Sequence, residues 1–319
     1  MNLKYLFKTS ILILCMGLVA SCSEDDDDVN TGEPQTQTYN AEVHLTDAPS
    51  DNPEVDAVFI TITEVKVNGE TIEGFEKTTV NISSLQNGQT ELLGDLELES
   101  GTTSEISLMF DNETDASGEA PANYVLTTNG EKKALGTASN EISITDQVEI
   151  QENDDNKIVL DFDLRKAIVS NTEGEYQFVS DTELAHSIRA VNSLEAGAIT
   201  GTVSDFGSTE SETVLVFAYE EGSYNESETA ANAEGVLFAN ATGSTKVNQS
   251  TGDFEIHFVE EGDYELHFVS FKDEDADGKL EFAGKIEATS ASEIDLLGFS
   301  VDANSEVSLE VILVGLLAL

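Results

Sequence analysis

Short stretches of this chain alternate between apolar and polar residues with a period of two. Because successive side chains of a strand point to opposite faces, this period indicates strands with one buried face. In the first half of the chain the pattern occurs at residues 41–46, 58–67, 79–82, 104–110, 124–128, 147–150, 157–164, 176–179 and 187–191. Turn residues separate these segments, and Asn68-Gly69 is a strong hairpin signal. The pattern predicts a β-sandwich, with a short helical piece near residues 92–98 as the one exception.

The alternation continues after Ala196-Gly197, which marks a domain boundary. Residues 254–258 and 264–269 carry large apolar residues at every second position, and residues 260–263 (Glu-Glu-Gly-Asp) predict a hairpin turn between them. The residues predicted to be buried in these strands and in the last one are Phe254, Ile256, Phe258, Tyr264, Leu266, Phe268, Val307, Leu309, Val311 and Leu313. We therefore expect an all-β protein with two β-sandwich domains, at residues 40–193 and 196–319.

Residues 1–21 have the order of a secretory signal peptide. Lys4 and Lys8 precede an apolar core at residues 11–19, and small residues lead to Cys22. The core is too short for a membrane-spanning helix of about 20 residues. We expect residues 22–39, which are acidic and then rich in Thr, Gln and Gly, to form a flexible linker.

The residues around Cys22 point to a lipid anchor. Ala20 and Ser21 directly before Cys22 resemble the lipobox of bacterial lipoproteins, which implies cleavage before Cys22 and acylation of this residue. The acyl chains, at about 0.8 kcal/mol per buried CH₂, would make a stable anchor. The alternative is an ordinary signal peptide that contains a cysteine. Cys15 lies in the leader, so the mature chain would keep one cysteine, which excludes an intramolecular disulfide and favours lipid attachment at Cys22.

An acidic run, Ser23-Glu24 and then Asp25 to Asp28, follows Cys22. One interpretation is a solvated, self-repelling tether between the membrane and the folded chain. The other is that this run looks like the surface-export signal of Bacteroidota lipoproteins. That resemblance implies a protein anchored in the outer membrane and exposed on the cell surface. The periplasmic face and the extracellular face both stay open at this point.

The charge of the chain restricts its partners. The formal net charge is −49, and removal of the leader takes away two lysines and no acids, which gives −49 − 2 = −51. Such a chain lacks the basic surface that neutralises phosphates, so we expect no nucleic-acid partner. It is also repelled by anionic lipid, which leaves the acyl anchor as the membrane contact. Divalent cations and neutral or cationic ligands fit this charge.

Residues 40–192 resemble a known bacterial family. The opening sequence Leu45-Thr46-Asp47-Ala48-Pro49, the strand at residues 58–67, the sequence Leu160-Asp161-Phe162-Asp163 and the closing Ile188-Arg189 are similar to the domain of unknown function 4382 of bacterial cell-surface lipoproteins. The resemblance implies an exported, β-rich module that often stands beside other sandwich modules. It implies no chemistry.

Residues 196–310 resemble a second family. The opening Ile199-Thr200-Gly201-Thr202-Val203, and the Gly-x-Phe and Gly-x-Tyr sequences before the strands at 254–258 and 264–269, are similar to carboxypeptidase-regulatory or transthyretin-like sandwiches. These belong to the carbohydrate-binding-like group of bacterial surface modules. Because the family's regulatory domain lacks catalytic residues, the resemblance implies spacing, assembly or ligand binding.

One loop in the second half has the spacing of a calcium site. Oxygen ligands are expected from Asp273, Asp275, Asp277, the backbone carbonyl of Lys279, and Glu281, in the order of the first half of an EF-hand loop. Position 12 is Gly284, where an EF-hand needs a bidentate glutamate. We predict a strand-loop-strand site for structural Ca²⁺. The alternative is an acidic Asp-Gly turn.

Two other groups of carboxylates occur in the first of the two predicted domains. Asp161 and Asp163 are two residues apart on a predicted strand and share one face, as a glycoside hydrolase with carboxylates about 5–9.5 Å apart needs. We favour the alternative, an acidic solvent face with Arg165 or Lys166 close by. A loop formed by Asp47, Asp51, Glu54 and Asp56 could bind Ca²⁺, but its spacing fits no defined motif. His44 and His186 are isolated on predicted strands, so we interpret them as packed or surface residues.

These patterns favour a non-enzymatic lipoprotein of the outer membrane that binds an extracellular ligand, with carbohydrate as the first class to test. The first alternative is a structural or adhesion component of the cell envelope. The second alternative is a glycoside hydrolase that uses Asp161 and Asp163. The sequence shows no Ser-His-Asp order, no HExxH motif and no Gly-rich phosphate loop.

Overall fold

The computed structural model describes residues 37–317, except residues 49–51, 53, 104, 137–138, 145, 154, 172–173, 210, 234 and 274–279. The described residues belong to one compact unit, Gln37–Leu319. The predicted signal peptide, Cys22 and residues 23–36 of the predicted linker lie outside the described residues. No helix in the described part of the chain is both long and apolar enough to cross a membrane.

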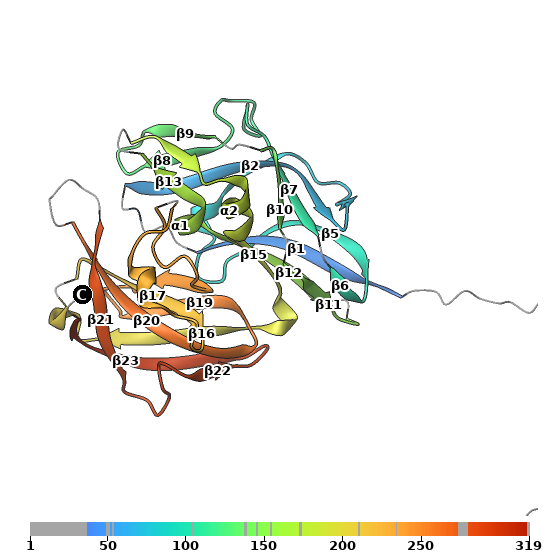
Figure 1. The fold of residues 1–319 in the computed structure, drawn as a ribbon. Coiled ribbons are helices and arrows are strands. Elements are labelled where there is room, and N and C mark those ends of the chain that lie inside the picture. Colours follow the sequence, from blue (N-terminus) through green and yellow to red (C-terminus); the bar gives the residue numbers. More distant parts are fainter. Residues whose placement is uncertain are drawn as a thin grey trace, which may run out of the picture. The chain divides into compact units, whose positions relative to one another are not determined.

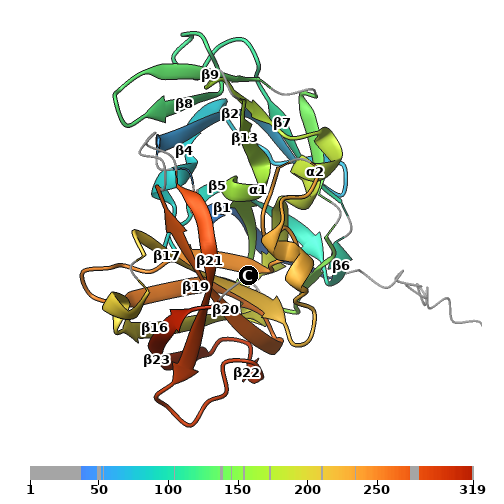
Figure 2. The same cartoon turned by 60° about the vertical axis from the view of Figure 1, so that its left-hand side comes forward.

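Strands dominate the described chain, and we call residues 38–192 the first lobe and residues 196–316 the second lobe (Figures 1 and 2). The strands of the first lobe are β1 (Thr38–Ala48), β2 (Val55–Val67), β3 (Glu70–Thr71), β4 (Thr78–Asn81), β5 (Glu91–Glu99), β6 (Gly101–Thr103), β7 (Ile106–Phe110), β8 (Tyr124–Thr127), β9 (Lys132–Gly136), β10 (Glu141–Ile144), β11 (Val148–Ile150), β12 (Asn156–Asp163), β13 (Ile168–Ser170), β14 (Tyr176–Phe178) and β15 (Ile188–Asn192). Those of the second lobe are β16 (Ala196–Ser204), β17 (Thr213–Glu220), β18 (Gly243–Lys246), β19 (Asp253–Glu260), β20 (Gly262–Lys272), β21 (Glu281–Ser290), β22 (Phe299–Val301) and β23 (Glu306–Leu316). The helices are α1 (Leu164–Ala167), α2 (Asp181–His186) and the 3₁₀ turns η1 (Ile82–Ser84), η2 (Ser193–Glu195), η3 (Phe206–Ser208) and η4 (Glu226–Thr229).

The first lobe is built from two main sheets. A four-stranded sheet has the order β15-β12-β1-β5, with β1 and β12 parallel. A nine-stranded sheet has the order β10-β7-β2-β8-β9-β14-β13, with β3 and β4 paired to β2. The apolar side chains of both sheets form one buried cluster that includes Leu45, Ile60 and Phe162. The alternation of apolar residues therefore folds the lobe as a sandwich around one core.

The second lobe has one eight-stranded sheet, with the order β18-β17-β20-β21-β23-β16-β19 and β22 paired to β20. The two ends of this order approach each other, because β18 contacts β19. The sheet therefore curves around its own core, which includes Val214, Phe254, Phe268 and Leu309. Strands of the second lobe pair only with one another among the described residues, and so do strands of the first lobe.

The predicted all-β fold class is confirmed, and each strand predicted between residues 41 and 191 overlaps an observed strand. The Asn68-Gly69 hairpin is also confirmed, with positive φ at both residues as a two-residue turn requires. The helical piece near residues 92–98 is wrong, because this segment is strand β5, paired antiparallel with β1. Gly94 takes a φ of 155° at the bulge in this pair, and the bulge disturbs the alternation that would have indicated a strand.

The predicted hairpin between residues 254–258 and 264–269 is wrong. Strand β19 pairs with β16, whereas β20 pairs with β17, β21 and β22. The prediction of which β19 residues are buried in the core is also wrong at one position. Phe254 and Ile256 are buried as expected, but a bulge opposite β16 turns Phe258 out of that core and buries Val259 instead. In β23, Leu309, Val311 and Leu313 are each 1% exposed, as predicted, and Val307 is half-buried.

Candidate functional site

A polar cleft of about 380 Å³ lies where β12 and β15 of the first lobe meet β17 and β19 of the second. Small-molecule pockets are typically of roughly 300–1,000 Å³ and are frequent where two folded parts meet. The ionisable side chains that line the cleft are Asp146, Asp161, Asp163, Lys166, His186, Arg189, Glu220 and Glu260. The cleft is therefore large enough for a small ligand and strongly polar.

One wall of the cleft is an ion pair between neighbouring strands. Asp161 of β12 lies directly opposite Arg189 of β15 in the antiparallel register, and the Arg189 Nη2 to Asp161 Oδ2 distance is 2.8 Å. Although burial acts against the charge of Arg189, the nearby Asp161 and Glu260 carboxylates raise its pKa above the ordinary value. The guanidinium is therefore a fixed positive charge at this wall.

The second charged group surrounds Asp163, which caps helix α1. Its Oδ1 accepts from the amides of Arg165 (3.1 Å) and Lys166 (3.3 Å), and its Oδ2 lies 3.0 Å from Arg165 Nη2 and 3.6 Å from Lys166 Nζ. Burial lowers the pKa of Lys166 and outweighs the opposite effect of Asp163. One carboxylate thus holds both the start of the helix and two cations.

The same three cations join the two lobes. Arg189 Nη1 donates to the carbonyl of Phe258 at 2.8 Å, and Lys166 Nζ donates to the carbonyl of Ala241 at 2.6 Å. Arg165 Nη1 donates to the carbonyl of Leu237. Each basic side chain comes from the first lobe and each carbonyl from the second. We call this set of contacts the joint.

Asp47 lies beside the joint and is 7% exposed. Neither of its carboxylate oxygens has a hydrogen-bond partner of normal geometry among the described residues. Burial, and then repulsion by Asp161 and Asp163, raises the pKa of Asp47 well above the ordinary value; the nearby Leu164 amide and Gln86 side chain offset only part of this effect. Asp47 therefore holds a proton under conditions in which exposed carboxyl groups are ionised.

The prediction for Asp161 and Asp163 is confirmed in one respect and wrong in another. Both residues line one cleft, while Phe162 between them is fully buried in the first-lobe core. The predicted contact with Arg165 and Lys166 is present. The face is not a solvent face, however, because the second lobe covers it and leaves the two side chains only 12% and 11% exposed. A single strand pattern does not reveal which other part of the chain will cover it.

The two histidines predicted on strands lie in different surroundings. His186 is the last residue of α2 rather than part of a strand, and it is exposed at the cleft. His44 is a packed strand residue, 9% exposed, that is hydrogen-bonded to Glu42 and Thr90. Among the described residues there is no group of three His, Cys, Asp or Glu side chains placed to hold a metal ion.

The predicted calcium loop and the second acidic loop are only partly described. Asp275, Asp277 and Lys279 lie outside the described residues, while Asp273 follows β20 and Glu281 begins β21. Strands therefore flank this loop, as predicted. In the other loop, Asp51 lies outside the described residues. Asp47 is buried beside the joint, and Asp56 is exposed on β2.

Two partly exposed tyrosines, Tyr124 and Tyr224, are covered by neighbouring side chains. The ring of Tyr124 stacks on Phe59 at 4.6 Å between centroids, and Lys132 Nζ lies 3.8 Å from the Tyr124 centroid. Tyr224 stacks on His267 at 3.9 Å and has Lys285 Nζ at 4.5 Å. A sugar stacks on an open ring face, so these two groups offer no ready platform.

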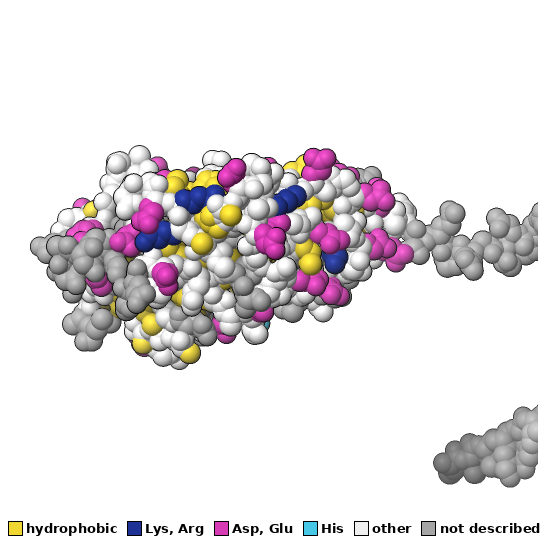
Figure 3. Space-filling model, turned by 90° about the horizontal axis from the view of Figure 1, so that it is seen from above, with side chains coloured by type: hydrophobic (Ala, Val, Ile, Leu, Met, Phe, Trp, Pro, Cys, Tyr) yellow, Lys and Arg dark blue, Asp and Glu magenta, His cyan; other side chains and the backbone are white. Residues whose placement is uncertain are grey.

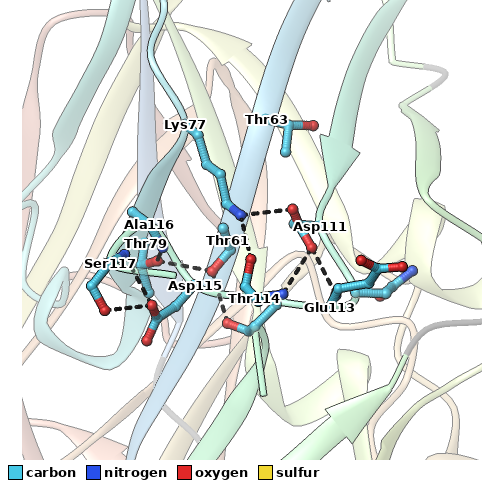
Figure 4. A network of polar contacts seen from close by, with 12 residues as sticks. Thr61, Thr63, Lys77, Thr79, Asp111, Glu113, Thr114, Asp115, Ala116 and Ser117 are labelled. Carbon is cyan, nitrogen blue, oxygen red and sulfur yellow. Dashed lines mark hydrogen bonds and ion pairs between the residues drawn. The ribbon is translucent and has the colours of Figure 1, made fainter. Parts of the chain in front are cut away.

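A network of polar contacts orders residues 111–119 beside β2 and β4 (Figure 4). Lys77 Nζ contacts Asp111 Oδ2 at 2.7 Å, and Asp111 Oδ1 accepts from the amides of Glu113 and Thr114. Asp115 Oδ1 accepts from the Ser117 hydroxyl at 2.6 Å and from the Ser117 and Glu119 amides. The Ser117 hydroxyl and then the Glu119 amide lower the pKa of Asp115 to about 2. The network uses these groups for loop structure, so it leaves no free constellation for chemistry.

Sequence reasoning missed the joint. The strand pattern places Arg189 only in a closing strand, although basic residues number 14 against 63 acids in this chain. This imbalance could have pointed to Arg189. A basic residue within a buried apolar strand is expected to have a specific acidic partner. On the face shown in Figure 3, Asp and Glu side chains are spread over the surface with few Lys and Arg among them.

Comparison with known proteins identifies one domain. A search of solved structures matches the chain to a leucine-rich repeat protein from Bacteroides thetaiotaomicron (12% identity, 88% of this chain, 27% of that chain, TM-score 0.22), the major pilin subunit BcpA of Bacillus cereus (10%, 87%, 70%, 0.22) and the shaft pilin spaA of Lactobacillus rhamnosus GG (12%, 88%, 100%, 0.19), and all three similarities are weak. The chain thus spans about a quarter of the first of these proteins. No curated protein matches the chain. Residues 40–180 match the family described as "Domain of unknown function (DUF4382)", so the chain contains a domain of this family.

Proposed function

We propose that this chain is a non-enzymatic, lipid-anchored surface protein of the outer membrane that binds a small polar ligand, a saccharide, in the cleft between its lobes. The observation that carries the proposal is the cleft of about 380 Å³, whose polar groups are held in place by ion pairs. Groups that are fixed before a ligand arrives lose little conformational entropy on binding. A preformed polar cleft therefore favours a ligand that is rich in hydrogen-bonding groups.

The charge of the cleft supports a neutral ligand over an anionic one. Its lining has five carboxyl groups against Lys166, Arg189 and His186. Sugar hydroxyls both donate and accept hydrogen bonds, so they can match carboxylates and cations in one site. An anionic ligand would meet a net negative surface in a chain that is acidic throughout.

The ion pairs also support a non-enzymatic role. Glycoside hydrolysis needs one carboxyl group that holds a proton and one that is free to act as a base or nucleophile. Asp161 and Asp163, the pair considered for this chemistry, are both bound to guanidinium groups and so are not free to act in these roles. The proposed role is therefore recognition.

A glycan array followed by calorimetry tests saccharide binding. Glu260→Gln and His186→Ala change exposed side chains of the cleft, and we expect each to weaken binding of an array hit by about tenfold, the effect of losing one good hydrogen bond to a charged group. Glu310→Gln, on the exposed face of β23, is the matched control and should bind normally. Absence of signal for every saccharide on the array would overturn this part of the proposal.

The anchor is tested separately. Cys22→Ser should move the protein from the membrane fraction to the soluble fraction, whereas Cys15→Ser in the leader should not. Protease added to intact cells should digest the wild-type protein if the acidic run directs it to the cell surface. Protection from the protease would place the protein on the periplasmic face instead.

The second candidate function is a structural or adhesion component of the envelope. The joint favours it, because three cations of the first lobe bind carbonyls of the second and limit relative motion of the lobes. A rigid module suits a spacer. Crosslinking in intact cells distinguishes the two candidates, since a spacer should give a reproducible protein partner and a saccharide-binding protein need not.

A further inference from the structure

Two phenylalanines of the second lobe have an unusual backbone conformation. Among the described residues, the non-glycine residues with positive φ are Asn68, Asn87, Asp205, Phe238, Phe258 and Asn304. Asn and Asp enter the left-handed region readily because their short polar side chains bond locally. The side chains of Phe238 (φ 51°) and Phe258 (φ 55°) cannot form such hydrogen bonds. A bulky residue with positive φ is therefore a conformational outlier.

Both outliers lie at the joint. The carbonyl of Phe258 accepts from Arg189 Nη1 at 2.8 Å. The carbonyl directly before Phe238, that of Leu237, accepts from Arg165 Nη1. The Phe238 carbonyl accepts from the amide of Ala241, whose own carbonyl accepts from Lys166 Nζ. Arg189 and Arg165 therefore contact backbone at or next to a left-handed phenylalanine, and Lys166 is linked to Phe238 through one backbone hydrogen bond.

Side-chain packing holds the same two residues. The ring of Phe258 packs with Val159 and Val191 of the first lobe and with Ala196, where the second lobe begins. The fully buried ring of Phe238 stacks on Phe217 at 4.4 Å between centroids, and the Arg165 guanidinium carbon lies 5.0 Å from the Phe217 centroid. The first lobe thus contacts Phe258 through both its ring and its carbonyl. It contacts the surroundings of Phe238 through Arg165, which lies near Leu237 and Phe217.

The local sequence does not require these conformations. One extra residue in β19 opposite β16 produces the bulge at residues 257–258, and glycine is the residue that such a bulge tolerates best. Strained backbone persists only when its surroundings over-determine it, and it concentrates at elements that switch. The bulge lies within the second lobe, and the further contacts of Phe258 with Arg189, Val159 and Val191 come from the other lobe.

We propose that the joint is a latch, in which Arg189 and Arg165 hold Phe258 and Phe238 in left-handed conformations that relax when the lobes separate. The latch shares Asp161, Arg189 and Glu260 with the walls of the cleft, so separation of the lobes would dismantle the cleft. The proposal concerns the conformation of the chain and does not depend on which ligand, if any, enters the cleft.

Hydrogen–deuterium exchange of the full chain, followed by mass spectrometry, tests the latch. The double variant Arg189→Met with Asp161→Asn removes the guanidinium without leaving a carboxylate unpaired. We expect exchange in peptides covering residues 236–242 and 254–260 to be roughly tenfold faster, as for a local opening, while peptides covering residues 58–65 and 307–313 stay protected as in wild type. The matched control is Lys77→Met with Asp111→Asn, which removes an ion pair of the first lobe that does not belong to the joint. It should leave exchange at residues 236–242 and 254–260 unchanged.

Two results would overturn the latch. One is unchanged exchange at residues 254–260 in the double variant; the other is an equal loss of protection in the two lobe cores, which would make Arg189 an ordinary determinant of global stability. Should the double variant fail to fold, Arg189→Lys retains the charge beside Asp161 but loses the planar guanidinium that serves two acceptors at once. The latch then predicts faster exchange at residues 254–260 alone, and unchanged exchange there would refute it.

Discussion

Gly88 of the first lobe lies against the ring of His257 in the second, so closely that a Cβ on Gly88 would stand 2.9 Å from His257 Nδ1. Gly88 has a φ of 74°. We predict that Gly88→Ala destabilises the protein by about 1–2 kcal/mol for the left-handed backbone and by a further 1–3 kcal/mol for overpacking. Gly74→Ala is the matched control, since Gly74 has a φ of 77° and nothing within 4 Å of its Cβ position. Urea denaturation measures the free energy of unfolding of both variants. Equal losses of stability would show that His257 moves to make room for the added methyl group at Gly88.

Asp47 predicts an unusual pH dependence. Its pKa is raised in the folded protein, so the stability that its bound proton confers is fully present below the unfolded pKa of about 3.9 and is lost as pH rises towards the folded pKa. We expect Asp47→Asn, a neutral isostere, to raise the free energy of unfolding at pH 7 by about 1–3 kcal/mol and to remove this decline. Denaturant titrations from pH 4 to 8 measure it, with the exposed Asp56→Asn as control. A loss of stability at pH 7 in Asp47→Asn would contradict the assignment.

Asp115 predicts the opposite sign. Its pKa is lowered to about 2, first by the Ser117 hydroxyl and then by the Glu119 amide, so its stabilising effect is present above about pH 3.9 and is lost as pH falls towards 2. Asp115→Ala should speed amide exchange in residues 111–119 at pH 7. The protection of these amides should also depend less on acidic pH in the variant than in wild type. Glu113→Ala, whose side chain is exposed, should change neither. Unchanged exchange in Asp115→Ala would mean that other contacts order the loop.

Calcium binding can be decided at the loop between β20 and β21. We predict that wild-type protein binds Ca²⁺ in calorimetry and that Asp275→Ala weakens this binding by at least about tenfold, because it removes a charged oxygen ligand. Asp295→Ala, in a different segment, should bind as wild type does. Absence of heat with the wild-type protein would rule the loop out as a calcium site under those conditions.

Much of the fold could be predicted from the sequence because strand periodicity is local. Residues 58–67 show their buried face directly, and the Asn68-Gly69 turn fixes its hairpin through backbone chemistry alone. Strand β5 could not be predicted, because the bulge at Gly94 interrupts its period and only pairing with β1 makes it a strand. Helix α1 is a single turn that owes its start to the Asp163 cap, a signal too short to read beside a strong strand pattern.

The candidate site was less predictable because it depends on pairing between distant segments. The sequence indicates that Asp161 and Asp163 share a face, but the partner Arg189 comes from a later strand and the carbonyl of Phe258 comes from the other lobe. Phe258 itself fits a simple alternation with Phe254 and Ile256. Its different position follows from one extra residue relative to β16, which no pattern within β19 reveals.

The parallel pair of β16 and β23 has a consequence for how the second lobe is made. These are its first and last strands, and β23 lies between β21 and β16 rather than at an edge of the sheet. The sheet therefore closes only when strands from both ends of the lobe pair, and contacts of such long sequence separation slow folding. We expect the self-repulsion of this acidic polypeptide to oppose association between copies before the sheet closes. The strong negative charge is therefore expected to lower aggregation during refolding.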